Sequence, residues 1–221
     1  MQKPLIVAHR INTLEGLRAL DPKYGVEIDI RGYGDKLLLT HDPIVTSNLH
    51  VYAEVEEYLK VFAEKNMAFV ILNVKEDGYE QRLIELCAKY SIPKEKYFLL
   101  DVEFPYLYRV TRKDPYVREI AVRYSEAEPI EMAERQIKDG VPMVDWTWID
   151  TNTRLPLDEE KDGKDIVNRL MKFKTALVCP SRWGRPEDID AYAEEIKAKG
   201  LRLDMVMTAD VYIPNWEKHF L

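Results

Sequence analysis

The chain has 221 residues, of which 46% are hydrophobic and 32% are charged, so it can bury a full core and is neither disordered nor fibrous. Its formal net charge is -7, from 32 Lys and Arg against 39 Asp and Glu. This charge argues against a nucleic-acid partner, because sequence-independent binding of nucleic acid needs a basic surface. Two cysteines, Cys87 and Cys179, are too few for a disulfide framework and are predicted to be reduced core thiols. We find neither a signal peptide nor a membrane span, so we expect a cytoplasmic protein without stable membrane association.

Short apolar runs alternate with longer amphipathic ones along the whole sequence, which is the pattern of successive βα units and a parallel sheet. Eight units in 221 residues average about 28 residues each, close to the roughly 30 residues of a βαβ unit. We therefore predict one domain over residues 1–221, a single (β/α)8 TIM barrel of the α/β class, with an open doubly wound sheet as the alternative. The predicted strands are Leu5–Ala8, Val26–Arg31, Phe69–Val74, Tyr97–Leu100, Ile120–Tyr124, Met143–Trp148, Ala176–Cys179 and Met205–Thr208.

Helices are expected between these strands. Asn12 with Glu15 three residues later has the spacing of a capping box and predicts the start of the first helix. Helical spacing also predicts Val51–Lys65, Glu80–Tyr90, Pro129–Lys138, Lys164–Phe173 and Glu187–Lys199, with Gly140 and Gly200 as stops. A short helix is expected over Tyr106–Arg112, and the polar stretch Asp150–Lys164 is expected to be a loop.

Charged residues gather where the predicted strands end, which is where active sites form in a barrel. Glu27 and Asp29 lie two apart on one strand and therefore point to the same face. Two carboxylates at a strand end favour a hard divalent cation. The alternative is a salt-bridge ladder of Glu27 and Asp29 with Arg31, or a strand that faces solvent.

Two of the four histidines follow strands that end at the same place. His9 comes directly after the first strand, and the apolar run before His41 is expected to pair antiparallel with the second strand and return His41 to the carboxylates. Imidazoles act as acids and bases near neutral pH. Asn73 and Lys75 share a face at the end of the third strand and offer a neutral oxygen ligand and a cation for a phosphate.

These residues resemble the glycerophosphodiester phosphodiesterase family, within the phosphatidylinositol phospholipase C-like group. The matching segments are His9-Arg10, Asn12-Thr13-Leu14-Glu15, Gly25-Val26-Glu27-Ile28-Asp29 and His41-Asp42-Pro43. The resemblance implies that Glu27 and Asp29 hold a divalent metal, Mg or Ca, that His9 and His41 are the general acid and base, and that Arg10 contacts the phosphate. Lys75 matches the lysine at the end of the family's third strand.

The sequence departs from the family at two places that bear on the site. Ile11 follows His9-Arg10 where the family has Gly and a longer loop, so the phosphate side of the site is altered. Asn73 stands where the family has its third metal carboxylate, which is expected to weaken metal binding although an amide oxygen still ligates Mg or Ca.

The C-terminal half adds two candidate substrate-binding residues, Trp146 and Arg182. Trp146 shares a face with Trp148, and an aromatic pair on a barrel strand is also typical of the core. Arg182 follows the seventh strand and is suited to a second anionic group or to a surface salt bridge.

The sequence thus predicts a metal-dependent phosphodiester hydrolase that acts on a small glycerophosphodiester-like substrate. One alternative is a lyase that releases a cyclic phosphate formed by a neighbouring hydroxyl of the substrate. A second is a non-catalytic barrel that binds phosphoesters through a weakened metal site. A third is an aldolase-like barrel with Lys75 as a Schiff-base amine, which neighbouring carboxylates disfavour by keeping the amine protonated.

Overall fold

The computed structural model describes residues 3–158 and 165–220. Its parallel strands are β1 (Leu5–Ala8), β2 (Gly25–Tyr33), β4 (Phe69–Val74), β5 (Tyr97–Leu100), β6 (Ala121–Tyr124), β9 (Trp146–Ile149), β10 (Lys174–Val178) and β11 (Met205–Thr208). The predicted bounds of β1, β4, β5 and β11 agree with the structure, whereas β2 is longer and β9 and β10 are displaced by two or three residues at one end.

The order of these strands identifies the fold. In the described chain the parallel strands lie in the order β5-β4-β2-β1-β11-β10-β9-β6, so strands that follow one another in sequence are neighbours, except β5 and β6 at its two ends, and β1 lies beside β11. The last strand therefore comes next to the first, and the N–H of Leu5 donates to the carbonyl oxygen of Asp204, just before β11, at 2.9 Å. An open doubly wound sheet does not place its first and last strands side by side in this way. The predicted (β/α)8 barrel fold is confirmed.

The described chain consists of two compact units. The N-terminal unit is Val7–Tyr108, and the C-terminal unit is Met1–Ile6 together with Arg109–Leu221. The boundary falls within β1, whose first residues pair in the C-terminal unit and whose last residues, Val7 and Ala8, pair with β2 in the N-terminal unit. The single domain over 1–221 stays a prediction.

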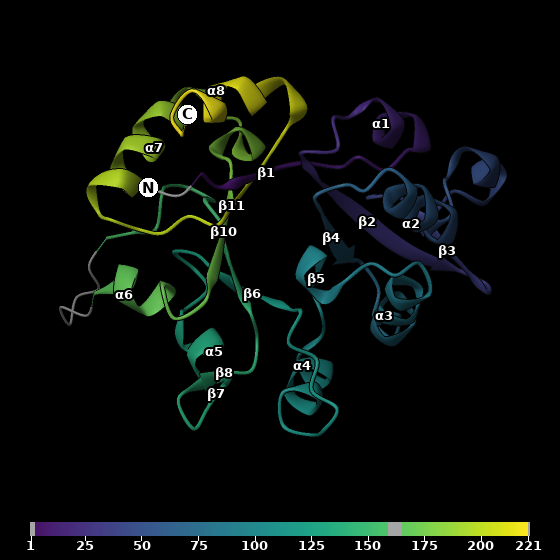
Figure 1. Cartoon of the computed structure of the whole chain (residues 1–221), viewed down its shortest axis with the longest axis horizontal. Helices are drawn as coiled ribbons and strands as arrows, with labels where there is room; N and C mark the ends of the chain where they lie inside the picture. The colour runs from purple at the N-terminus through teal and green to yellow at the C-terminus, as the bar shows by residue number, and fades with distance from the viewer. Residues whose placement is uncertain (1–2, 159–164, 221) are drawn as a thin grey trace. The chain divides into compact units, whose positions relative to one another are not determined.

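The N-terminal unit contains the antiparallel strand β3 (Lys36–Leu39), which returns along β2 after a two-residue turn at Gly34, where φ is 60°. This return was predicted from the sequence. Its helices, of which α1, α2 and α3 lie side by side (Figure 1), are α1 (Leu14–Ala19), η1 (Thr46–Val51), α2 (Val55–Glu64), α3 (Glu80–Lys89), η2 (Lys94–Lys96) and α4 (Phe104–Val110). The prediction that Asn12 caps α1 was wrong, because the side-chain oxygen of Thr13 accepts the hydrogen bond from the N–H of Gly16.

The helices of this unit bury one face each. On α2 the buried residues are Val55, Tyr58, Leu59 and Phe62, with the i, i+3, i+4, i+7 spacing of an amphipathic helix. Each such apolar side chain stabilises the fold by about 1.5–3 kcal/mol relative to an exposed position.

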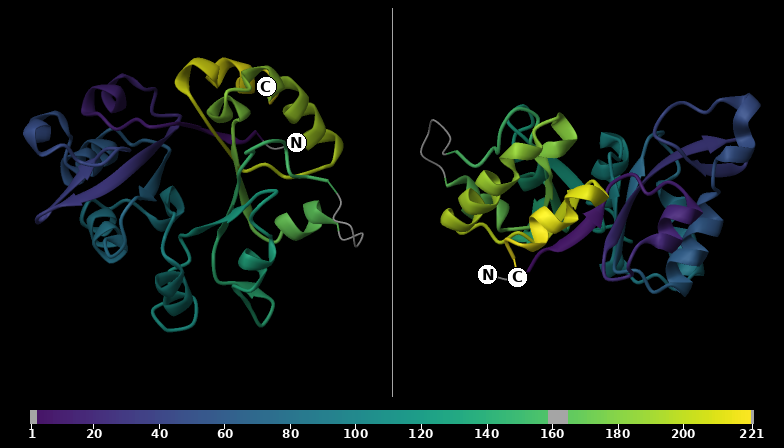
Figure 2. Two further views of the ribbon diagram at one scale, coloured as in Figure 1. Left: turned by 180° about the vertical axis from the view of Figure 1, so that it is seen from behind. Right: turned by 90° about the horizontal axis from the view of Figure 1, so that it is seen from above.

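The C-terminal unit contains α5 (Glu131–Glu134), α6 (Ile166–Leu170), η3 (Pro180–Trp183), η4 (Pro186–Asp188), α7 (Ile189–Ala198), η5 (Asp210–Tyr212) and α8 (Ile213–Glu217), with α7 and α8 packed together (Figure 2). The helix predicted over Pro129–Lys138 was wrong in its second half. Ile137–Lys138 forms β7, paired with β8 (Val141–Pro142) around Asp139 and Gly140, which have φ of 50° and 78°. Two consecutive positive φ values belong to a tight hairpin turn.

Other predictions concern the core and the loop after β9. Both Cys87 and Cys179 are buried free thiols, as expected. Residues 150–158 contain no helix or strand, in agreement with the predicted loop, while 159–164 lie outside the described residues. Among the helices of the described chain, none combines the length and the apolar character needed to cross a membrane.

Candidate active site

Glu27 and Asp29 lie side by side on β2 with 1% of each residue exposed. The register of the parallel pair β2–β4 sets Asp29 opposite Asn73. The alternative, a salt-bridge ladder with Arg31, is not formed, since Arg31 pairs with Glu76 at 3.0 Å. The two carboxylates are therefore buried, and they face polar groups of other segments.

Glu27 is held by two donors. Its Oε1 accepts from Asn73 Nδ2 at 2.8 Å, and its Oε2 accepts from the backbone N–H of Arg10 at 2.9 Å. Arg10 adopts a positive φ of 56°, a conformation uncommon for a residue other than glycine, in the turn that aims this N–H at Glu27. Burial, with the neighbouring Asp29 charge, raises the pKa of Glu27 to about 7 against the lowering effects of these donors. A cation beside this group would favour its charged form.

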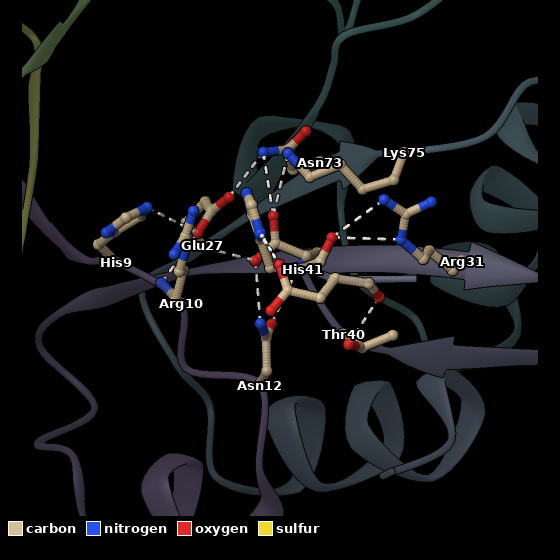
Figure 3. Close-up of polar contacts among 11 residues, drawn as sticks. His9, Arg10, Asn12, Glu27, Arg31, Thr40, His41, Asn73 and Lys75 are labelled. Atoms are coloured by element: carbon tan, nitrogen blue, oxygen red, sulfur yellow. Dashed lines mark hydrogen bonds and ion pairs between the residues drawn. The ribbon is translucent and has the colours of Figure 1, made fainter. Parts of the chain in front are cut away.

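Asp29 is held by an amide and an ammonium group. Asn12 Nδ2 donates to Asp29 Oδ2 at 2.9 Å, and the N–H of Asp29 donates to Asn12 Oδ1 at 2.9 Å. Lys75 Nζ lies 3.1 Å from Asp29 Oδ1, and Arg10 Nε lies 3.9 Å from Oδ2 (Figure 3). The contact of Asn12 with Asp29 was not predicted, although its place two residues after Arg10 was a usable signal.

The two histidines approach the carboxylates from different segments. His9 follows β1, and its Nε2 lies 3.9 Å from Glu27 Oε2. His41 follows β3, where the N–H of Thr40 donates to the carbonyl oxygen of Asp29 at 3.0 Å. Its Nδ1 is 2.8 Å from Asp42 Oδ1, so the Nε2 atom is the one left for proton transfer to a bound molecule. Figure 3 shows the predicted residues of the N-terminal unit gathered in one group.

Asn73 decides whether this group suits a divalent cation. Its Nδ2 donates to Glu27 and also lies 3.4 Å from Asp29 Oδ1, while its Oδ1 is buried without a hydrogen-bond partner. Half a turn of the amide would bring the unpartnered oxygen to the carboxylates and give three oxygen donors, which is the donor chemistry of Mg or Ca. No cluster of three or more His, Cys, Asp or Glu side chains able to hold a metal occurs in residues 3–158 and 165–220. The residues present fit a hard cation only with the Asn73 oxygen as the third donor.

The other two predicted substrate-binding residues lie in the C-terminal unit. Trp146 is the first residue of β9, is 7% exposed, and has Lys174 Nζ 5.3 Å from its ring centroid, at the start of β10. Trp146 therefore lies at the amino end of β9, whereas active sites of this fold form at the carboxyl ends of the strands. Arg182 lies in η3 after β10, and its guanidinium is 5.3 Å from the ring centroid of Trp183.

A polar group that was not predicted from the sequence lies at the carboxyl ends of strands in the same unit. Asp150, directly after β9, accepts from Arg123 Nη1 and from Trp183 Nε1, both at 2.8 Å. The register that sets Arg123 of β6 beside Trp148 of β9 brings these residues together.

Solved structures show which known proteins share this fold. The chain is similar to a glycerophosphodiester phosphodiesterase from Parabacteroides distasonis, with a TM-score of 0.68 and 14% identity over 99% of this chain and 97% of that one. A glycerophosphoryl diester phosphodiesterase from the same organism gives a TM-score of 0.65 and 13% identity over 100% and 88% of the two chains. The chain has the fold of the glycerophosphodiester phosphodiesterases. No family model matches the sequence, and no curated protein does.

Proposed function

We propose that the chain is a phosphodiester hydrolase that acts on a small glycerophosphodiester. The observation that carries the proposal is the grouping of His9, Arg10, His41 and Lys75 around the buried pair Glu27 and Asp29. The fold shared with glycerophosphodiester phosphodiesterases supports it. The substrate class comes from the names of those proteins.

In the proposed reaction, Lys75 and the Arg10 guanidinium bind the phosphate oxygens and neutralise the charge that develops on them. One of His9 and His41 removes a proton from the attacking hydroxyl, which belongs to water or to the substrate, and the other donates a proton to the leaving alcohol. We propose that Glu27, Asp29 and the Asn73 oxygen hold Mg or Ca, which when bound supplies Lewis-acid charge at the phosphate. Attack by a substrate hydroxyl would first give a cyclic phosphate, and its release would make the enzyme a lyase.

The decisive experiment is hydrolysis of a panel of glycerophosphodiesters and one chromogenic phosphodiester, with Mg, Ca or a chelator. We expect turnover that the chelator abolishes. His9→Ala and His41→Ala should each reduce kcat by about 10²–10⁴-fold, the range of general acid–base catalysis, with unchanged thermal unfolding. Full activity in both variants would contradict the assignment.

A non-catalytic phosphoester-binding barrel is the second candidate, and Asn73 favours it. As it lies in the structure, its amide donates to both carboxylates and replaces one negative charge of a cation site. Calorimetric titration with Mg and Ca separates the two functions. Metal binding by Asn73→Asp but not by the wild type, together with no turnover of any substrate, would support the binding protein.

A further inference from the structure

The loop that carries His41 is fixed by an arginine of the neighbouring strand. Arg31 of β2 lies opposite Leu38 of β3, three residues before His41. Its guanidinium donates twice to the backbone carbonyl oxygen of His41, from Nε at 3.2 Å and from Nη2 at 3.0 Å (Figure 3). Both bonds hold the peptide group of His41, so they determine where its side chain begins.

Glu76 in turn fixes Arg31. Its Oε1 accepts from Arg31 Nη1 at 3.0 Å, and its Oε2 accepts from the backbone N–H of Gly32 at 2.9 Å. The carboxylate thus ties the guanidinium to the backbone of the residue after Arg31. Because Glu76 directly follows Lys75, the same contacts join the segment that carries Lys75 to the segment that carries His41.

An ordinary surface ion pair does not account for this arrangement. Such pairs contribute about 0–1 kcal/mol and join exposed side chains. Here 18% of the Arg31 side chain and 39% of the Glu76 side chain are exposed, and both side chains also bond to backbone groups. Arg31 also directs two of its donors to the backbone of a residue with a proposed chemical role. The His41 ring itself contacts Asp42, whose side chain is 87% exposed, so the bonds from Arg31 to the His41 backbone are the more firmly held restraint.

We propose that Arg31 and Glu76 are positioning residues that set the place of the His41 imidazole at the carboxylates. The inference rests on the proposed function, in which His41 transfers a proton. A shift of about 1 Å in a group of this kind lowers a reaction rate by roughly 10²-fold. Neither residue needs to touch the substrate, so their loss should act on turnover and not on substrate binding.

The kinetic test compares Arg31→Met, Arg31→Lys and Glu76→Gln with Lys89→Met as the matched control. Lys89 forms an ion pair with Glu56 in the same unit, and neither residue belongs to the site. We expect Arg31→Met to lower kcat by about 10–100-fold while KM changes by less than about threefold. Glu76→Gln keeps an acceptor for only one of the two donors, Arg31 Nη1 and the Gly32 N–H, and should lower kcat by about 3–10-fold. Lys89→Met should leave kcat and KM unchanged. A loss of activity through KM alone, or equal effects in variant and control, would overturn the inference.

A readout independent of turnover separates this inference from the proposed function. The imidazole proton resonances of His41, assigned by their loss in His41→Ala, should shift in Arg31→Met and Glu76→Gln and stay unchanged in Lys89→Met. Unchanged resonances in both site variants would overturn the positioning role. If the wild type hydrolyses no phosphodiester, the proposed function fails, and the resonances alone then test whether Arg31 and Glu76 position His41. If Arg31→Met does not fold, Glu76→Gln and Arg31→Lys carry both measurements.

Discussion

At the scale of single residues, every carboxylate oxygen of Glu27 and Asp29 contacts a donor of the chain itself. The two oxygens of Glu27 accept from Asn73 and from the Arg10 N–H, and those of Asp29 contact Lys75 and Asn12. A buried carboxylate without partners would be strongly disfavoured in its charged form. These donors therefore offset part of the cost of burying two carboxyl groups side by side, and they leave second lone pairs on the oxygens for a ligand.

Asn12 and its neighbour Thr13 provide a matched pair of variants that test whether Asn12 supports Asp29. Asn12→Ala removes both hydrogen bonds between Asn12 and Asp29 and leaves the buried N–H of Asp29 without its acceptor, so we expect a loss of about 1–3 kcal/mol and reduced turnover. Thr13→Ala removes only the cap of α1 and should lower stability by about 1 kcal/mol with normal turnover. Denaturant unfolding and kcat measure the two effects. Equal turnover in both variants would show that Asn12 does not support Asp29.

At the scale of elements, the strands that carry the site were predictable and their partners were not. Apolar runs flanked by polar residues predicted the bounds of β1, β4 and β5 to the residue, because the sequences of buried parallel strands are continuous hydrophobic segments. The pairing of Glu27 with the Arg10 N–H depends on a turn with positive φ at Arg10, which residue type does not indicate. The grouping of Arg31 with Glu76 joins residues 45 apart in sequence and depends on the register of strands.

One error was avoidable at the same scale. Gly140 was predicted to be the stop of a helix, although Asp139-Gly140 between short runs is a strong hairpin signal. Gly140 takes part in that turn with φ of 78°.

Gly25 tests how closely β2 packs against its neighbours. A Cβ atom there would lie 2.8 Å from Val7 Cγ2 and 3.0 Å from the carbonyl oxygen of Phe69, so it would force the backbone of β4 or the Val7 side chain to shift. We expect Gly25→Ala to destabilise the protein by about 1–3 kcal/mol. Gly34→Asn is the control, since a Cβ meets nothing within 4 Å and asparagine tolerates the φ of 60°. Equal unfolding midpoints for the two variants would contradict this packing.

At the scale of the whole molecule, stability in acid depends on ion pairs far from the site in sequence. Arg169 of α6 is 8% exposed and lies 2.7 Å from Glu134 of α5, with Glu131 as a further partner. Its hydrogen bonds lower the pKa of Glu134 from 4.5 to about 2, against the raising effect of burial. The folded pKa is below the unfolded value, so the pair stabilises the fold fully above about pH 4.5 and loses this effect as the pH falls toward 2.

Glu134→Gln should therefore lower the free energy of unfolding at pH 7 by about 1–2 kcal/mol. The difference from the wild type should shrink as the pH falls from 4.5 toward 2, because the wild type loses its charge there. Urea unfolding at a series of pH values measures this. A difference that is constant with pH would contradict the electrostatic origin of the effect.

The sharing of β1 between the two units has a consequence for dividing the gene. Its first residues pair with the segment before β11, and its last residues pair with β2. A fragment that ends at residue 108 would keep the whole strand, while a fragment that begins at 109 would lack the partner of β11 and expose an unpaired edge, which promotes aggregation. Two halves of this protein could be produced separately only if the codons for residues 1–8 were copied in front of the second half.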